Sequence, residues 1–419
     1  MSKIYDTIIE YGQKLSTIRF RLGDAPQIMV KEGLLVYATV PDADLEHLTL
    51  ADIQEIGASA NPFKGAMIES GYDALIISQP EYATMCIEDQ LPIPAVLEDM
   101  AQIVGSRVAI TPEDRISMGS ALKKSAAVMT AKGNVATCGR NLYEAMTCLM
   151  VLEKNAEIFI DADFLGGAKT VNRAIAKLEN IIYHYKYSKN EMDRQKALET
   201  GDSPISKLED IPADVLEDAE ADYEGWEDAH PSPRPCNPEE QKLREQVVEY
   251  GKKLVACGLV QGTWGNLSVR LNASYMLCTP SGRDYEGILP EEIVKVNMET
   301  LEYDGDIKPT SEKDFHAGIY QLRPDVHAII HTHSKFACVF GVCGLSFKTT
   351  SGDVIECAKY GPSGTGILSK NVQNAIGENK GCLMRNHGMV AVGSDLEDAF
   401  RNAASIENAA KARIDEFWK

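Results

Sequence analysis

The sequence predicts an α/β protein that contains two tandem copies of one domain. Two observations support this prediction. Helices and strands recur in the same order in residues 1–190 and 240–419, and the segment between them differs sharply in composition. Each half opens with an amphipathic helix, "IIEYGQKL" or "VVEYGKKL", and each closes with a long Ala-rich helix. Self-similarity of this kind indicates a repeated structural unit.

The central elements of the two halves also correspond. An apolar run followed by a helical stretch appears as "DALIISQPEYATMC" in the first half and as "VHAIIHTHSKFACVF" in the second. A further pair of apolar runs joined by a turn appears as "AAVMTAKGNVATCG" and "GCLMRNHGMVAVG". Short apolar runs bounded by turn residues are typical of buried strands. We therefore expect each half to form its own sheet, flanked by helices.

A linker is predicted between the two halves, over residues 191–239. Eleven acidic residues and a single lysine, Lys207, lie between Asp202 and Asp228, and four prolines follow between Pro231 and Pro238. Low hydrophobicity, high charge and helix breakers are typical of a loosely packed connection. The predicted organisation is a domain at 1–190, the linker, and a domain at 240–419.

Composition excludes several classes of partner. The 419 residues carry a formal net charge of −20, whereas nucleic acids and anionic membranes require a basic face. The chain has no run of about 18 apolar residues, and its first residues resemble an amphipathic helix rather than a signal peptide. The ten cysteines include no CxxC pair, which favours free thiols. We expect a cytoplasmic protein without a nucleic acid or membrane partner.

Three histidines of the second half are candidate metal ligands. His331 and His333 follow the apolar run "AII", and side chains two apart on a strand point to the same face. His387 interrupts a second apolar stretch and is followed by a glycine that permits close approach of the backbone. Three imidazoles are the ligand set of catalytic zinc, and other divalent first-row metals also accept them. The alternative is a group of surface histidines, and His316 and His327 are assigned surface or supporting roles.

Polar turns of the second half suggest an anion site beside these histidines. Glu312 follows Thr310 and Ser311 at a predicted helix start, where hydroxyls and free backbone N–H groups can hold phosphate. The turns "GTWGN" (262–266) and "TPSG" (279–282) can present further N–H groups. A carboxylate beside a metal can also accept a proton. The alternative for Glu312 is an acid that only stabilises the first turn of a helix.

The first half lacks these chemical groups. Alignment of the two halves places residues without metal-binding capacity opposite the three histidines and the glutamate: Ser78, Pro80, Lys132 and Ser59. We expect the first half to keep the scaffold and to bind no metal.

The second half resembles the class II aldolase/adducin family, in particular its L-fuculose-phosphate aldolase branch. The stretches "QGTWGNLSVR", "CTPSGRDYEGI", "TSEKDFH", "RPDVHAIIHTHS" and "RNHGMVAVG" carry the resemblance, in the family's order and at similar spacing. It implies a three-layer α/β/α domain with a central, largely antiparallel sheet. With the repeat described above, the resemblance implies two such domains in tandem.

The resemblance also implies roles for individual residues. His331, His333 and His387 correspond to the zinc ligands, and Glu312 to the residue that transfers the proton. Tyr360 corresponds to an acid that reaches the site of a neighbouring subunit. Six residues correspond to the substrate-phosphate loops: Gly265, Asn266, Ser281, Gly282, Thr310 and Ser311.

The function that the resemblance implies is zinc-dependent aldol cleavage. The substrate would be a ketose phosphate, cleaved through an enediolate to dihydroxyacetone phosphate and an aldehyde. The alternatives are a sugar-phosphate 4-epimerase or dehydratase on the same scaffold, and a non-catalytic assembly protein like the adducins. Family enzymes form four-fold rings, so a homo-oligomer is expected. It would be either a dimer that forms a pseudo-four-fold ring or a tetramer.

Overall fold

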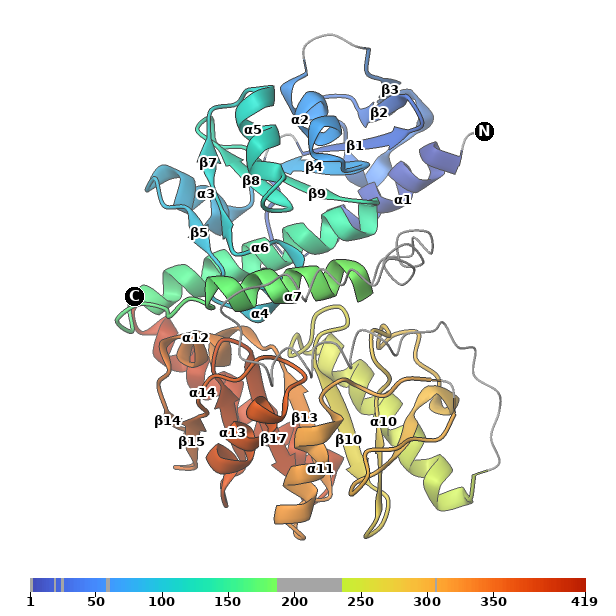
Figure 1. Cartoon of the computed structure of the whole chain (residues 1–419), viewed down its shortest axis with the longest axis vertical. Helices are drawn as coiled ribbons and strands as arrows, with labels where there is room; N and C mark the ends of the chain where they lie inside the picture. The colour runs from blue at the N-terminus through green and yellow to red at the C-terminus, as the bar shows by residue number, and fades with distance from the viewer. Residues whose placement is uncertain (1–2, 19, 24–25, 58–60, 187–235, 306) are drawn as a thin grey trace. The chain divides into compact units, whose positions relative to one another are not determined.

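Two mixed β-sheets organise the chain, one of seven strands and one of eight (Figure 1). The chain divides into a first unit, Met1–Ile160 with Val171–His184, and a second unit, Asp161–Thr170 with Tyr185–Lys419. The computed structural model describes residues 3–18, 20–23, 26–57, 61–186, 236–305 and 307–419.

The predicted linker lies almost entirely outside the described residues. Its last residues are described, and there Pro238 begins the helix that opens the second unit. Asn237 precedes this helix, and its side-chain oxygen accepts a hydrogen bond from the N–H of Glu240. A proline at the first helical position after a capping asparagine is a regular helix start.

The sheet of the first unit has the strand order β3-β2-β1-β4-β9-β8-β7. Neighbouring strands are antiparallel except β8 and β7, which run parallel. The strands are β1 (Gln27–Glu32), β2 (Leu35–Thr39), β3 (Ile53–Glu55), β4 (Ala74–Ser78), β7 (Ile110–Thr111), β8 (Ala127–Thr130) and β9 (Val135–Gly139). A separate pair is formed by β5 (Ile93–Pro94) and β6 (Arg107–Val108).

Helices cover both faces of this first sheet. Ile28 faces a core shared with α1 and α6, whereas the next residue, Met29, faces a core shared with α2 and α5. The alternation follows from the two-residue period of a strand. The α-helices are α1 (Lys3–Ser16), α2 (Pro62–Ser70), α3 (Glu81–Glu88), α4 (Glu98–Ile103), α5 (Arg115–Leu122), α6 (Leu142–Asp163) and α7 (Arg173–Lys186). Two 3-10 helices, η1 (Leu45–His47) and η2 (Leu50–Asp52), precede β3.

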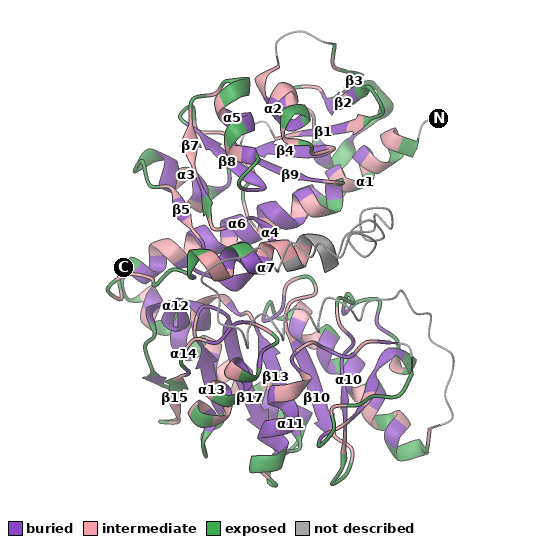
Figure 2. Cartoon of the chain, in the orientation of Figure 1, coloured by how far each residue is buried: buried purple, intermediate pink, exposed green. Residues whose placement is uncertain are grey.

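The sheet of the second unit has the order β12-β11-β10-β13-β17-β16-β15-β14. Its neighbours are antiparallel except β16 and β15, which run parallel. The strands are β10 (Asn266–Arg270), β11 (Tyr275–Cys278), β12 (Val294–Asn297), β13 (Ala328–Thr332), β14 (Phe347–Lys348), β15 (Val354–Cys357), β16 (Gly381–Met384) and β17 (Gly388–Gly393). The central strands are buried along their length (Figure 2).

Helices cover both faces of the second sheet as well. Helices α11 and α13 pack on one face, around Phe315, Ile329 and Val372. Helices α10, α12 and α14 contact the sheet through β10, β13, β16 and β17. The α-helices are α10 (Pro238–Ala256), α11 (Lys313–Leu322), α12 (Lys335–Cys343), α13 (Gly366–Ile376) and α14 (Leu396–Asp415), with one 3-10 helix, η3 (Pro290–Glu292).

The two sheets share strand order and direction. Reading β3 to β7 in the first sheet and β12 to β15 in the second gives the same sequence of antiparallel pairs, ending in one parallel pair. Strand β14 extends the second sheet by one antiparallel edge strand. The prediction of two α/β domains, each with a largely antiparallel sheet between helices, is confirmed.

The cysteines are free thiols, as expected. None of the ten forms a disulfide, and burial raises the pKa of six buried thiols: Cys86, Cys138, Cys148, Cys278, Cys343 and Cys382. In the described part of the chain, no helix combines the length and apolar character needed to cross a bilayer.

Candidate metal centre

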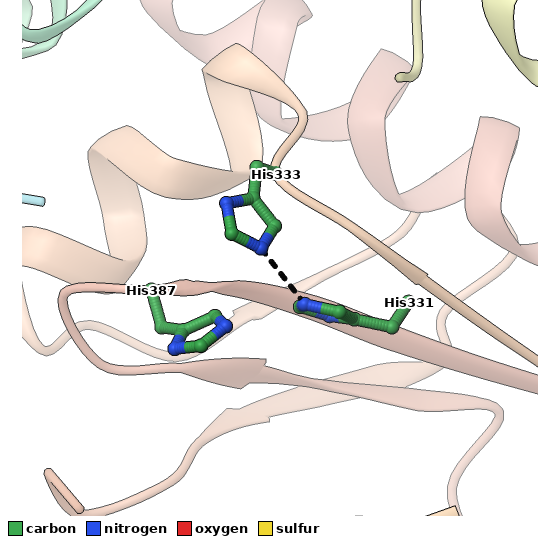
Figure 3. A group of neighbouring side chains, drawn as sticks. All are labelled: His331, His333 and His387. Atoms are coloured by element: carbon green, nitrogen blue, oxygen red, sulfur yellow. Dashed lines mark hydrogen bonds between the residues drawn. The ribbon is translucent and has the colours of Figure 1, made fainter. Parts of the chain in front are cut away.

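Three histidines converge at one end of the second sheet (Figure 3). His331 lies near the end of β13, His333 directly follows that strand, and His387 occupies the turn between β16 and β17. Their ligand atoms lie within 4.8 Å of one another, and their ring centroids are 4.8, 5.0 and 4.7 Å apart. His331 and His387 are buried, whereas His333 is partly exposed. The structure therefore brings together all three predicted ligands.

The arrangement fits a divalent metal ion. Nε2 of His331 lies 2.9 Å from Nε2 of His333. Two nitrogens bound to one tetrahedral zinc ion are about 3.3 Å apart, so small ring movements suffice. Nδ1 of His331 lies 2.9 Å from the carbonyl oxygen of Met389, which accepts a hydrogen bond from it and leaves the Nε2 lone pair free. Burial lowers the pKa of His331 to about 3, so the ring is neutral and able to bind metal.

Two glycines let the backbone close around His331. A Cβ on Gly388 would lie 2.4 Å from the carbonyl oxygen of Thr332 and 2.9 Å from Cε1 of His331. A Cβ on Gly265 would lie 2.6 Å from the carbonyl oxygen of His331, and its φ of +98° also disfavours other residues. The predicted close approach at Gly388 is confirmed.

Glu312 is buried directly against the histidines. Its Oε2 lies 3.2 Å from Nε2 of His331, and its Oε1 lies 3.1 Å from Nε2 of His387. Nδ2 of Asn266 donates a hydrogen bond of 2.8 Å to Oε2. Burial by itself raises the pKa of Glu312, but the attraction of His331 and His387 outweighs it and holds the pKa well below its ordinary value. The net shift of the pKa is downward, which favours the ionised form of the carboxylate.

The turn before α11 differs from the predicted helix start. The helix begins at Lys313, after Glu312. The hydroxyl of Thr310 accepts a hydrogen bond of 3.2 Å from the N–H of Glu312, so it fixes the turn that presents the carboxylate. Ser311 lies in that turn and is partly exposed.

The loops predicted to hold phosphate lie next to one another. The N–H of Thr310 donates to the carbonyl of Thr279 at 3.0 Å, and Pro280 forms a bridge with Pro309. These contacts place the turn carrying Ser281 beside the turn carrying Glu312. The hydrogen bond from Asn266 to Glu312 brings in the loop that contains Gly265. Ser281 is partly exposed and Gly282 is exposed.

Comparison with known proteins identifies the second unit. A family model described as "Class II Aldolase and Adducin N-terminal domain" matches residues 245–414. The 5-deoxy-D-ribulose 1-phosphate aldolase of Bacillus thuringiensis is 34% identical over 178 residues, which cover 41% of this chain and 84% of that protein. The L-fuculose phosphate aldolase of Escherichia coli is 33% identical over 180 residues, covering 41% and 83%. The chain belongs to the class II aldolase/adducin family.

A solved structure titled L-fuculose 1-phosphate aldolase also matches part of the chain. It is 32% identical, covers 42% of this chain and 88% of its own, and has a TM-score of 0.40. The sequence match and the three histidines together give the chain a class II aldolase domain with a metal-binding site. The matched residues fall within the second unit.

Tyr360 lies in the loop after β15 of the aldolase domain. In the sheet, β15 is separated from β17 by β16. The side chain is partly exposed, and the carbonyl of Tyr360 accepts a hydrogen bond of 2.9 Å from Nδ2 of Asn371. Its assignment as a catalytic acid stays a prediction.

The buried group formed by Ser268, His316 and Tyr320 was not predicted from the sequence. His316 is fully buried, so a surface role is wrong for it, whereas a supporting role remains. Ser268 and Tyr320 are buried beside it and bond to each other. Spacing could have revealed them: Ser268 lies two residues after Asn266 on a strand, and His316 and Tyr320 follow Glu312 at intervals of four on a helix.

The sheet register corrects the predicted counterparts in the first unit. Strand β4 pairs Ala74 with Gly139, as β13 pairs Ala328 with Gly393. Counting three and five residues onward from Ala74 places Ile77 opposite His331 and Gln79 opposite His333.

The counterparts Ser78 and Pro80 are therefore each wrong by one residue. The turn is also misaligned by one residue, in the opposite direction, because Thr130 bonds to Asn134 as Met384 pairs with Gly388. Gly133, not Lys132, corresponds to His387. Ser59 lies outside the described residues. Within the described part of the chain, the three histidines are the group that could hold a metal, and none is found in the first unit.

Proposed function

We propose that the second unit is a metal-dependent aldolase that cleaves a ketose phosphate to dihydroxyacetone phosphate and an aldehyde. The main support is the buried Glu312 carboxylate, whose oxygens lie 3.1 and 3.2 Å from imidazole nitrogens of two candidate ligands. Metal-dependent aldol cleavage needs the metal and a proton-transfer group at the same place. The similarity to a 5-deoxy-D-ribulose 1-phosphate aldolase and an L-fuculose phosphate aldolase supports a sugar-phosphate substrate.

His331, His333 and His387 would hold the metal, for which we propose zinc. Three neutral imidazoles suit Zn²⁺, and other divalent first-row ions also accept this set. When bound, the ion supplies Lewis acidity toward the carbonyl of the substrate.

Glu312 would move the proton at the carbon that becomes nucleophilic. Oε2 accepts the hydrogen bond from Asn266, whereas Oε1 faces Nε2 of His387 at 3.1 Å. The ionised state of Glu312 fits a proton acceptor.

The adjoining turns would bind the phosphate group of the substrate. They contain two glycines, whose N–H groups an anion can approach closely, and hydroxyls at the start of α11. The proposed contacts come from Gly265, Asn266, Ser281, Gly282, Thr310 and Ser311.

Tyr360 is proposed to protonate the leaving aldehyde oxygen in the site of a neighbouring subunit. This role requires an oligomer, which we propose to be a dimer with a pseudo-four-fold ring or a tetramer. The shared sheet topology supports a tandem repeat with domains at 1–190 and 240–419 and a linker between them.

The test is release of dihydroxyacetone phosphate from a panel of ketose 1-phosphates, with and without a chelator. We expect release that stops when the metal is removed. In the Glu312→Gln variant, turnover should fall by about 10²–10⁴-fold with metal content unchanged. The exposed Glu299→Gln serves as the matched control and should keep full activity.

Other outcomes point elsewhere. Metal-loaded protein that releases no triose phosphate but converts the sugar would indicate a 4-epimerase or dehydratase. Protein that binds no metal would indicate an adducin-like assembly role. Loss of metal in Glu312→Gln would make Glu312 a ligand instead of a base.

A further inference from the structure

A continuous chain of buried hydrogen bonds runs from Glu312 into the core of the second unit. Asn266 donates to Glu312 at 2.8 Å, and its Oδ1 lies 2.5 Å from Nε2 of His316. Nδ1 of His316 lies 2.7 Å from the hydroxyl of Ser268, which lies 2.9 Å from the hydroxyl of Tyr320. All five side chains are buried, with at most 6% exposure. Strand β10 and helix α11 with its preceding turn supply every member.

The direction of each hydrogen bond in this chain follows from its carboxylate end. Oε2 of Glu312 accepts from Nδ2 of Asn266, so Oδ1 of Asn266 faces His316. Oδ1 only accepts, so Nε2 of His316 must carry a proton. Burial lowers the pKa of His316 to about 4, so the ring is neutral and Nδ1 is an acceptor. Ser268 then donates to Nδ1, and Tyr320 donates to Ser268.

These hydrogen bonds have one consistent arrangement, in which the direction of each bond fixes the direction of the next. If Asn266 rotated its amide, Oδ1 would face the Glu312 carboxylate and Nδ2 would face the N–H of His316. Both contacts would be repulsive, and a buried polar group without a partner is destabilising. His316 is itself held in place, because the Phe315 ring stacks on it with centroids 4.5 Å apart and an angle of 25°.

We propose that His316 is a positioning residue for Glu312. It acts through Asn266, in the single tautomer that the hydrogen bond to Asn266 Oδ1 requires and Ser268 accommodates. The chain of hydrogen bonds holds Oε2 of Glu312 in place and so orients Oε1 toward the metal ligands and the substrate. This inference rests on the proposed role of Glu312 in proton transfer.

The first test uses kinetics on metal-loaded protein. In His316→Phe, Asn266 loses its donor, and we expect kcat to fall about 10- to 100-fold, since small misplacements of catalytic groups have effects of this size. KM and metal content should change less than threefold. His316→Gln should recover much of the loss, because its amide can donate to Asn266. The exposed His327→Gln is the control. A merely structural role would lower the melting temperature of both His316 variants without separating kcat from KM.

The second test does not depend on activity. Long-range ¹H–¹⁵N NMR of imidazole-labelled, metal-loaded protein should show His316 neutral, with the proton on Nε2. Crystal structures of the wild-type chain and His316→Phe, both with metal, should show the Asn266–Glu312 hydrogen bond intact in the first and broken in the second.

The outcomes separate the two proposals. An Nδ1-protonated or charged His316, or an unmoved Glu312 in His316→Phe, overturns the positioning role whatever the enzyme does. A wild-type chain that is inactive on every ketose phosphate removes the proposed function. In that case, the tautomer and the two crystal structures still decide whether His316 orients the carboxylate.

Discussion

The main chain encloses His331 on two sides, so even one atom added to a neighbouring residue should disturb the ring. The carbonyl of Met389 fixes its Nδ1, and the glycines at 265 and 388 leave no space for a side chain. Partners of this kind orient a metal ligand, and their loss typically lowers metal affinity about 10- to 100-fold.

Gly388→Ala should therefore weaken metal binding by about tenfold or more. The added Cβ would meet the carbonyl oxygen of Thr332 at 2.4 Å and Cε1 of His331 at 2.9 Å, so β13 and β17 must part or the ring must tilt. Competition with a chromogenic chelator measures the effect. Gly366→Ala is the matched control, because nothing lies within 4 Å of its added Cβ. Equal affinity in the two variants would contradict the explanation.

At the residue scale, the sequence predicted the metal ligands better than it predicted the residues that bond in series to Glu312, namely Asn266 and His316. Alternation along one strand is a local pattern, and it correctly placed His331 and His333 together. The hydrogen bonds of Asn266 and His316 depend on how β10 packs against α11, 50 residues apart in the chain. A single sequence does not determine that packing, so a supporting histidine could not be told from a surface one.

At the element scale, a glutamate links the long helix after the last strand of each unit to a shorter helix. Glu153 of α6 accepts hydrogen bonds from the N–H groups of Tyr82 and Ala83 at the start of α3. Glu407 of α14 accepts from two N–H groups at the start of α12 in the same way. Neither short helix has a side-chain cap of its own. The glutamates satisfy donors that a helix start leaves free.

This contact should make stability depend on pH. Burial raises the pKa of Glu153 to about 7, whereas an unfolded glutamate titrates near about 4.3. Between these values the folded state binds more protons, so the free energy of unfolding falls as pH rises. The stabilisation is complete below about 4.3 and lost as pH passes about 7. The maximum change is about 3–4 kcal/mol at about 1.4 kcal/mol per pK unit.

Glu153→Gln cannot titrate, so its free energy of unfolding should fall less steeply than that of wild type between pH 5 and 8. Urea unfolding at several pH values measures the two slopes, and a constant offset from the changed side chain does not affect them. The exposed Glu88→Gln should keep the wild-type slope. Identical slopes for Glu153→Gln and wild type would show that Glu153 is already ionised when folded.

At the scale of the whole molecule, the order of elements was predictable and the exact alignment of the two halves was not. Both halves keep the same succession of helices and apolar runs along the chain, and this succession was visible in the sequence. The alignment was wrong by one residue, because a stretch such as "ALIIS" matches "AIIHT" almost equally well in either register. Pairing with a neighbouring strand resolves it, since a one-residue slip would turn every side chain to the other face.

The corrected alignment strengthens the prediction that each chain binds one metal ion. Ile77 and Gly133 occupy the positions of His331 and His387 in the first unit, and neither offers a ligand atom. The apolar Ile77 also fills the core where an imidazole would bind. Elemental analysis after dialysis against a weak chelator, which strips ions from exposed acidic groups, should give one ion per chain. His387→Ala should bring the value close to zero. Two ions per chain, or retention in His387→Ala, would locate a second site and contradict the assignment of the first unit as metal-free.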